Sequence, residues 1–250
     1  MAVKKSLMMM VTIMIMLSSA HAVVLVSADC PKSVYMYEVF TCKVILYNDS
    51  EEDAVLDYVV RFDKEHAVPM SEEGNREIIL PALAKKVLEV NVWASSVGKD
   101  VFVFEYGHGT IDRIAAKALT ITPSPLYIDL DSINATAGQK NVVKTEIVGK
   151  GHFVQISIKY PQSIIGTARL DVGDVDGAKP ITINMSPDPY SIGTTTMSVY
   201  IRFADDRGNH TLLQKIPINV SPSYQLIGAV GIFVVLLLAV ALFIRRRSNP

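Results

Sequence analysis

The sequence predicts an all-β protein outside the cytoplasm: two β-sandwich domains in tandem, a C-terminal transmembrane helix and an N-terminal signal peptide. Three observations lead to this prediction. An apolar run lies near each end of the 250-residue chain, strand-like segments recur at short intervals between them, and Pro-rich breaks divide this central part. Strand segments spaced roughly every 8–12 residues, with turn signals between them, are typical of sandwiches.

Residues 1–22 have the features of a signal peptide. The basic pair Lys4-Lys5 precedes an apolar run over residues 7–17, and Ala20-His21-Ala22 has the small-residue pattern of a cleavage site. A second candidate cleavage site ends at Ala28. The expected signal peptide is therefore 1–22, with cleavage as late as residue 28.

Two alternatives to cleavage remain at this end. The apolar stretch continues to Val26, which is long enough for an uncleaved membrane anchor. A lipoprotein fits less well, because Asp29 stands before Cys30 where a small residue is needed.

The 19 residues from Leu226 to Ile244 carry no charge and predict a transmembrane helix. As a helix they span roughly 28 Å, which matches a hydrocarbon core of about 30 Å. Arg245, Arg246 and Arg247 follow at once, and basic flanks stay in the cytoplasm. We therefore expect a type I protein of the cell membrane with a cytoplasmic tail at 245–250. The alternative is a buried globular helix.

Charge argues against one class of partner. All 25 acidic residues lie between the two apolar segments, and 19 of the 24 basic residues accompany them, which gives this part a net charge of −6. Nucleic-acid binding needs clustered Lys and Arg, and no cluster is visible there. We expect no nucleic acid as a partner.

The chain has two cysteines, Cys30 and Cys42. In an oxidising compartment they can form a disulfide, and closing so short a loop stabilises a fold by about 3 kcal/mol. The alternative is two free thiols.

Five asparagines begin an N-x-S/T acceptor, and such acceptors are surface positions in exported proteins. Five of the eight asparagines between the apolar segments do so, more than chance predicts, and glycans are possible partners. The predicted glycosylation sites are Asn48, Asn134, Asn184, Asn209 and Asn219.

Each half of the central part offers about seven strands. The breaks at Pro123-Ser124-Pro125 and Ser221-Pro222-Ser223 cannot continue a ladder, so we expect domains at 29–122 and 126–221. The first half has expected strands at 33–37, 39–47, 54–62, 76–80, 86–94, 100–106 and 111–121. The second has them at 126–130, 141–148, 152–160, 167–172, 180–184, 195–203 and 210–220.

Alternation supports this interpretation. Met197, Val199, Ile201 and Phe203 share one face of an expected strand, as residues at even spacing do. The segment around 111–119 is rich in alanine, and we expect it to be a strand all the same.

Polar turns and core patterns carry a resemblance to a known family. Residues 47–54 form a polar turn before a strand, residues 78–87 read Ile-Ile-Leu-Pro-Ala-Leu and onward, and Ile201 to Asn209 ends in a hairpin turn with Phe203 where the family often has Tyr. Over roughly residues 30–220 the chain resembles the CARDB and related Ig-like repeats of archaeal and bacterial S-layer-type surface proteins. The resemblance implies seven-stranded sandwiches of a cell-envelope stalk or adhesion module, and it brings no catalytic residues.

The search for reaction chemistry finds little. Residues 171–177, with Asp171, Asp174 and Asp176, lack two ligands of an EF-hand calcium loop and are expected to be a solvated turn between strands. No nucleophile–base pair or phosphate loop can be assembled. We expect Trp93, the only tryptophan, to be a core or sheet residue rather than a sugar platform. We expect no catalytic residues, no metal and no cofactor.

The sequence therefore predicts a non-enzymatic structural or interaction protein of the cell envelope: a stalk, an adhesion module or an accessory subunit of a surface complex. Its expected partners are the membrane and other envelope or membrane proteins. A carbohydrate- or peptide-binding surface module is the alternative.

Overall fold

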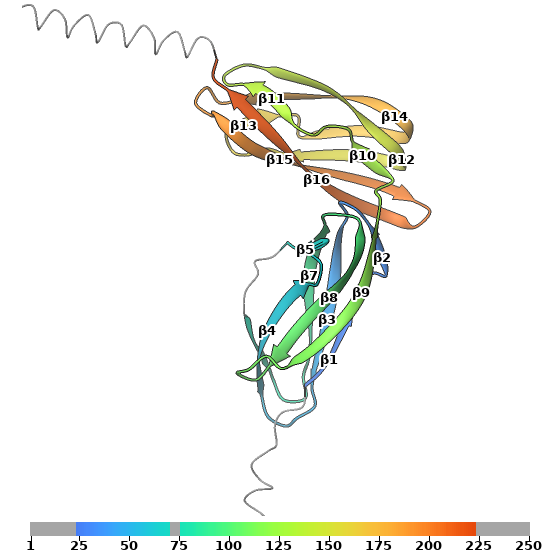
Figure 1. The fold of residues 1–250 in the computed structure, drawn as a ribbon, viewed down its shortest axis with the longest axis vertical. Helices are drawn as coiled ribbons and strands as arrows, with labels where there is room; N and C mark the ends of the chain where they lie inside the picture. The colour runs from blue at the N-terminus through green and yellow to red at the C-terminus, as the bar shows by residue number, and fades with distance from the viewer. Residues whose placement is uncertain (1–23, 71–75, 224–250) are drawn as a thin grey trace, which may run out of the picture. The chain divides into compact units, whose positions relative to one another are not determined.

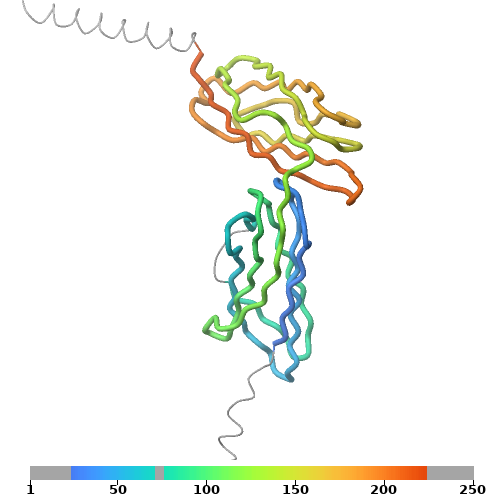
Figure 2. Tube along the Cα trace, turned by 45° about the vertical axis from the view of Figure 1, so that its right-hand side comes forward, coloured from blue at the N-terminus to red at the C-terminus, as the bar shows by residue number. Residues whose placement is uncertain are grey.

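The computed structural model describes residues 24–70 and 76–223, and all regular structure there is β-strand. These residues form two compact units (Figures 1 and 2). Unit 1 runs to Val34 and from Phe40 to Thr122, and unit 2 contains Tyr35–Val39 and everything from Pro123 onward. The predicted signal peptide 1–22 and the predicted membrane helix 226–244 lie outside the described residues. Within the described ranges, no helix has the length and apolarity to cross a membrane.

Unit 1 contains two sheets that form a sandwich-like fold. Strand β1 of the first sheet lies against β9 of the second, and β5 of the first lies against β4 of the second. The first sheet has the order β1 (Val24–Asp29), β3 (Val39–Asn48), β7 (Lys85–Ala94), β5 (Ala67–Pro69). The second has the order β2 (Ser33–Tyr35), β9 (Arg113–Thr122), β8 (Gly98–Gly107), β4 (Ala54–Phe62), β6 (Arg76–Leu80).

Alternation of apolar residues explains which face of each strand is buried. In β7, Val90, Val92 and Ala94 are buried while Glu89 and Asn91 are exposed, as the period of two requires. Aromatic rings on β4 and β8 add contacts at 5.2–5.6 Å between centroids. The alanine-rich segment is strand β9, which confirms the sequence prediction.

A buried carboxylate holds the connection between β4 and β5. Asp100 is almost fully buried, and its Oδ1 accepts hydrogen bonds from the main-chain amides of Lys64 and Val101 at 2.9 and 2.8 Å. Its Oδ2 accepts from the amides of His66 and Ala67 at 2.8 and 3.1 Å. A buried polar group must be paired in this way, and here one side chain satisfies four amides.

Unit 2 is built on one sheet of seven strands. Its order is β11 (Ile133–Thr136), β16 (Gly208–Ser221), β15 (Gly193–Asp205), β12 (Asn141–Lys159), β14 (Arg169–Pro187), β13 (Ile164–Gly166), and β10 (Leu126–Ile128) pairs with β12. Strand β11 runs parallel to β16, while the other pairs are antiparallel. One core of buried residues fills the unit.

Strands β12 and β14 form a long ribbon whose two halves have different neighbours. The first half of β12 pairs with β10 through Ile147–Gly149, and the second half pairs with β15 from His152 onward. Register shifts mark the change between Gly151 and Gln155, and Phe153 has a φ of +54° there. The ribbon therefore bends at a bulge, which is the usual way for a strand to pass between two layers.

This ribbon corrects two sequence predictions. The expected strands at 141–148 and 152–160 are one strand, β12. Residues 171–177, expected to be a solvated turn between strands, lie inside β14, where Gly173 and Gly177 have φ of +76° and +99°. Glycine takes these angles without steric cost, so the chain bends there and keeps its pairing with β12.

Unit 2 includes five residues from the first part of the chain, Tyr35–Val39. The amide of Leu213 in β16 donates to the carbonyl of Tyr37 at 2.6 Å, and Glu38 forms a β-bridge with Leu212. The buried side chain of Gln214 accepts from the amide of Ile128 at 2.7 Å and donates to its carbonyl at 3.2 Å. The segment Tyr35–Val39 and strand β10 are thus both hydrogen-bonded to β16.

Replacing Asp100 by Asn should destabilise unit 1. The new NH2 group would replace one carboxylate oxygen and would face two main-chain amides, which would then lose their acceptor. We therefore expect a loss of about 2–4 kcal/mol in the free energy of unfolding. Urea unfolding followed through the fluorescence of Trp93, the chain's one tryptophan, measures it. Asp112→Asn at an exposed position is the control. Equal stability of both variants would contradict this role of Asp100.

Candidate functional site

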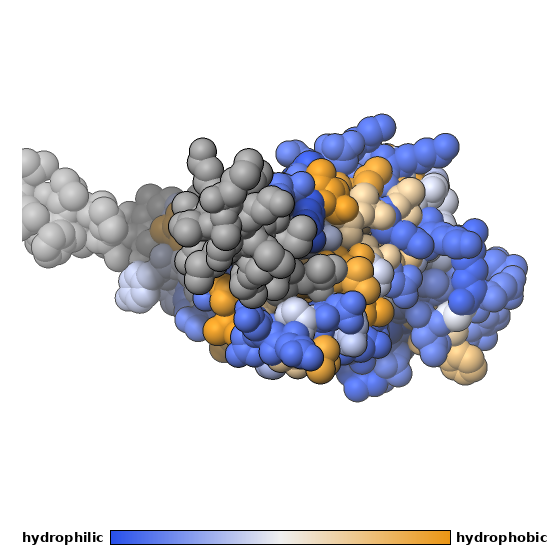
Figure 3. All heavy atoms as spheres, turned by 90° about the horizontal axis from the view of Figure 1, so that it is seen from below, coloured by the Kyte–Doolittle hydropathy of each residue, from blue (hydrophilic) through white to orange (hydrophobic). Residues whose placement is uncertain are grey.

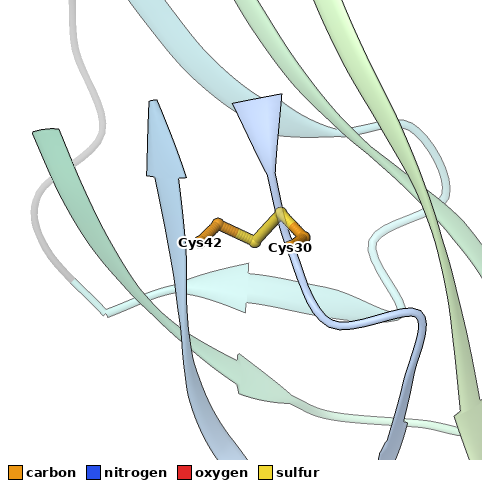
Figure 4. Close-up of a disulfide and its surroundings, with 2 residues drawn as sticks. All are labelled: Cys30 and Cys42. Atoms are coloured by element: carbon orange, nitrogen blue, oxygen red, sulfur yellow. A yellow bond between two sulfur atoms is a disulfide. The ribbon is translucent and has the colours of Figure 1, made fainter. Parts of the chain in front are cut away.

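A disulfide joins the residue after β1 to strand β3 in unit 1. Cys30 follows β1 directly and is bonded to Cys42 of β3 (Figure 4). The register of β1 against β3 pairs Asp29 with Lys43, so the next position places the two cysteines opposite each other. Both are buried, and neither is a free thiol. The predicted disulfide is confirmed.

The side chain of Asn48 is a structural group inside unit 1. It is 0% exposed, and its Nδ2 donates to the main-chain carbonyls of Glu52, Leu80 and Pro81 at 2.8, 3.2 and 3.1 Å. Its Oδ1 accepts from the amide and the hydroxyl of Ser50 at 3.1 and 2.8 Å. One amide group therefore ties the turn after β3 to the turn after β6.

This geometry corrects the expectation that all five acceptor asparagines lie at the surface. The nitrogen that would carry a glycan is buried and occupied at Asn48, so a glycan there is incompatible with this fold. Asn134 and Asn209 are exposed, and Asn184 and Asn219 are half-buried. These four stay predictions as glycosylation sites.

Two of the remaining acceptors are neighbours in the sheet. Asn134 of β11 and Asn219 of β16 are partners in the parallel register, and Nδ2 of Asn219 lies 3.4 Å from Oδ1 of Asn134. Thr194 also donates to Oδ1 of Asn219 at 3.0 Å. Glycans on both would compete for the same space, so the pair offers room for one.

A group of ionisable side chains surrounds His210 in unit 2. Its Nδ1 lies 2.8 Å from Oε1 of Glu38, and its Nε2 lies 2.9 Å from Oδ1 of Asp205. Tyr35 donates its hydroxyl to Oδ2 of Asp205 at 2.9 Å, and the Arg207 guanidinium lies 4.9 Å from the centroid of the Tyr35 ring. We call these five residues the His210 cluster. The side chains of Glu38, Asp205 and His210 are mostly buried.

The surroundings shift two pKa values in the His210 cluster. Burial alone would raise the pKa of the Asp205 carboxyl, but hydrogen bonds from the Arg207 amide, the Tyr35 hydroxyl and the His210 ring outweigh it and hold this pKa below its usual value. Burial, and then the hydrogen bond to Asp205, raise the pKa of Tyr35. Both shifts favour an ionised Asp205 that accepts from a neutral tyrosine.

The hydrogen bonds of the His210 cluster hold distant segments of unit 2 together. Carboxylates only accept, so both contacts of His210 are hydrogen bonds when both of its nitrogens carry a proton. Neither nitrogen is then open for a substrate or a metal. In the described part of the chain, no group of three or more His, Cys, Asp or Glu side chains is arranged to hold a metal ion.

Sequence reasoning missed this cluster because its parts are far apart in the chain. Glu38 and His210 are separated by 172 positions. The sequence around Asp205 and Arg207 predicts only a hairpin turn, and the pairing of β15 with β16 confirms that turn. The sole local signal was three charged residues within that turn.

The acidic residues at 171–177 do not converge on one point. Asp174 accepts from the amide of Phe153 at 3.0 Å and lies 3.4 Å from Nδ1 of His152. These contacts lower the pKa of Asp174, with the hydrogen bond from the Phe153 amide as the largest cause. The carboxylate stabilises the bulge of β12, where Phe153 is 78% exposed.

An open groove of about 370 Å³ lies in unit 2 beside the segment Tyr35–Val39. Tyr37 and Tyr127 contribute aromatic rings to its lining, and Asp129 and Asp131 contribute carboxylates. Tyr127 is partly exposed. Aromatic faces and acidic oxygens together suit a sugar ring and its hydroxyl groups. The groove is lined by Met36, Tyr37, Ser124, Tyr127, Ile128, Asp129, Leu130, Asp131, Gln214, Lys215 and Ile216.

Comparisons with known proteins show no family. No family model and no curated protein matches the sequence. Among solved structures, red sea bream transglutaminase is similar at 12% identity and a TM-score of 0.32, over 80% of this chain and 31% of that one. The native form of E. coli alpha-2-macroglobulin is similar at 9% identity and a TM-score of 0.40, over 80% of this chain and 17% of that one. The chain thus spans less than a third of either protein, and such distant similarity supports no conclusion about function.

Replacing Asn48 by Asp should destabilise unit 1 although the shape is conserved. A carboxylate oxygen would replace the donor that faces three carbonyl oxygens, and we expect a cost of at least about 2 kcal/mol in the free energy of unfolding. Urea unfolding followed by Trp93 fluorescence checks this. Asn209→Asp, at an exposed acceptor position, should change stability by less than about 0.5 kcal/mol. If both variants unfold alike, the role assigned to Asn48 is wrong.

The contribution of Asp205 to the stability of unit 2 should depend on pH. Because its pKa is lower in the folded chain, this contribution is complete above the unfolded value near 3.8 and disappears as pH falls through the folded value. Asp205→Asn should therefore unfold more easily than wild type at pH 6, by about 1–2 kcal/mol for the weakened hydrogen bonds. The two proteins should converge between pH 4 and the acid limit, as calorimetry can measure. Asp206→Asn, at the exposed neighbouring position, is the control, and a gap that stays constant with pH would contradict the assignment.

Proposed function

We propose that this protein is a membrane-anchored structural or interaction protein of the cell envelope, without enzymatic activity. Residues 29–122 and 126–221 would be two Ig-like sandwich domains outside the membrane, extended by β1 at the first domain's start. Residues 1–22 would be the signal peptide, and 226–244 would be the anchor. The proposed role is that of a stalk, an adhesion module or an accessory subunit.

The disulfide is the observation that carries this proposal. Disulfides persist in oxidising compartments and are rare in the cytosol of most organisms. Cys30 and Cys42 are both buried and bonded to each other, so they have no role left as metal ligands or reactive thiols. A cross-linked all-β unit in a chain with an apolar segment near each end fits export to the cell surface.

The geometry around Asn48 supports the resemblance to CARDB-type repeats. The resemblance uses the polar turn at 47–54 and the apolar segment with Pro81, which are about 30 residues apart. Asn48 joins these two motifs, because its amide bonds to the carbonyls of Glu52, Leu80 and Pro81. Asp53 adds a second link by accepting from the amide of Ala82 at 2.9 Å.

The groove of unit 2 favours a second candidate, a carbohydrate-binding surface module. Tyr37 and Tyr127 would provide ring faces, and Asp129 and Asp131 would accept hydrogen bonds from sugar hydroxyl groups. Trp93 is half-buried in β7, in the register opposite Val68, and belongs to unit 1. It is therefore no part of this groove.

Purification from native membranes separates the two candidates. A stoichiometric envelope protein that stays with the chain through gentle solubilisation supports the structural role. Binding to soluble glycans on an array, with no protein partner retained, supports the second candidate. Substrate turnover that one point mutation abolishes would overturn both.

Strand β1 makes the export prediction specific. Cleavage after Ala22 leaves all of β1 in the mature chain, whereas cleavage after Ala28 removes five of its six residues. We therefore expect a mature N-terminus at Val23, which intact mass measurement or N-terminal sequencing can show. A mature chain that begins at Asp29 would contradict this, because β3 would then lose its neighbour β1.

The same material tests the anchor. The full chain should stay with membranes through an alkaline carbonate wash, and a chain stopped after Ser223 should appear outside the cells. Release of the full chain by the wash would contradict a transmembrane anchor.

A further inference from the structure

Several turns are hydrogen-bonded to one another at the end of unit 2 where β16 ends. The amide of Ala137 donates to the carbonyl of Ser221, and the amide of Gly138 donates to the carbonyl of Pro187, both at 2.9 Å. The amide of Asp188 donates to the carbonyl of Ser163, also at 2.9 Å. The turn after β11 is therefore hydrogen-bonded to the last residue of β16 and to the end of β14, and the loop after β14 is hydrogen-bonded to the turn before β13.

Three large apolar side chains are exposed here, two in the loop after β14 and one in strand β13. Tyr190 is 84% exposed, Ile165 is 76% exposed and Ile192 is 53% exposed. Single exposed apolar residues are ordinary on protein surfaces. Figure 3 shows such hydrophobic residues among hydrophilic ones on one face of the molecule. These three differ because they gather at one end of one unit. We call them the apolar tip.

Main-chain contacts hold the apolar tip in place. Ile165 pairs with Ser186 at the end of β14, and the loop that follows β14 folds back on itself. In that loop the amide of Ser191 donates to the carbonyl of Asp188 at 3.0 Å, and the amide of Ile192 donates to the carbonyl of Tyr190 at 3.1 Å. The exposed side chains of Tyr190 and Ile192 are therefore presented by a hydrogen-bonded loop, and apolar side chains that gather on a surface mark interaction sites.

The chain itself limits what lies next to this end. Gly193, the residue after Ile192, pairs with Val220, so the loop adjoins the C-terminal end of strand β16. Leu226, the first residue of the predicted membrane helix, follows Ser221 by five positions, which is at most about 17 Å of extended chain. The apolar tip is therefore within reach of any bilayer that contains Leu226.

We propose that the apolar tip contacts the lipid bilayer, with Tyr190, Ile165 and Ile192 in the interfacial layer. This inference rests on the proposed membrane anchor. Tyrosine is enriched at membrane interfaces, where its ring is in apolar surroundings and its hydroxyl reaches water. The turns at this end carry one acidic residue, Asp188, and one basic residue, Lys140, so their formal charges sum to zero. A tethered surface needs little intrinsic affinity for the bilayer, because the anchor keeps its effective concentration high.

The test uses the full chain reconstituted in phosphatidylcholine vesicles. A tryptophan replaces Tyr190 in one variant and Ile165 in a second, and fluorescence quenching is measured with nitroxide-labelled lipid in the membrane. The wild-type chain corrects for Trp93. The matched control is Phe153→Trp, since Phe153 is an exposed aromatic residue of the same unit. Its neighbour His152 pairs with Ala204, eleven residues along β15 from Gly193, which is roughly 36 Å of strand.

We expect lipid nitroxide to quench Tyr190→Trp and Ile165→Trp at least about twofold more strongly than Phe153→Trp. Equal quenching of all three in a chain that resists a carbonate wash would overturn the apolar tip and leave the membrane anchor standing. Tryptophans shielded from an aqueous quencher but not reached by lipid nitroxide would indicate a protein on this surface and would also overturn it. A chain that the wash releases would overturn both the anchor and the tip.

Discussion

Buried polar side chains that bond to the main chain fix the connections on which both units depend. Asn48, Asp100 and Gln214 are all buried, and each hydrogen-bonds to the backbone of a segment outside its own strand. A strand pair satisfies its own amides and carbonyls, but a connection that crosses a core does not. Because an unpaired buried polar group costs about 1–3 kcal/mol, each of these side chains specifies one course of the chain over its alternatives.

The strands themselves were largely predictable, because alternation is a local property of the sequence. In β15 the predicted face of Met197, Val199, Ile201 and Phe203 is buried in full. The bend of the β12–β14 ribbon was not predictable, since Gly149 and Gly151 look the same in a bulge as in a loop between strands. Strand β1 was missed for another reason. Its residues continue the apolarity of the predicted signal peptide, and only their pairing with β3 separates the two.

The candidate sites were less predictable, because a motif carries no information about burial. The tripeptide that begins at Asn48 matches a glycan acceptor, yet its amide bonds to three carbonyl oxygens in the interior. The same pattern at Asn209 is exposed. The His210 cluster is the reverse case, since Glu38 carries no signal of its own and gains its role only through a partner 172 positions away. The all-β, sandwich-like architecture follows from the sequence, whereas the polar contacts that hold it require the fold.

The parallel pairing of β11 with β16 has a mechanical consequence. Tension that reaches β11 at Ile133 and leaves β16 through Ser221 pulls β11 toward its start and β16 toward its end. The two strands run side by side in the same direction, so this tension loads their hydrogen bonds in shear, all four register pairs from Ile133–Ile218 to Thr136–Ser221 at once. Bonds loaded together break at a higher force than bonds that open one after another. A unit connected in this way is suited to transmit force between its two ends.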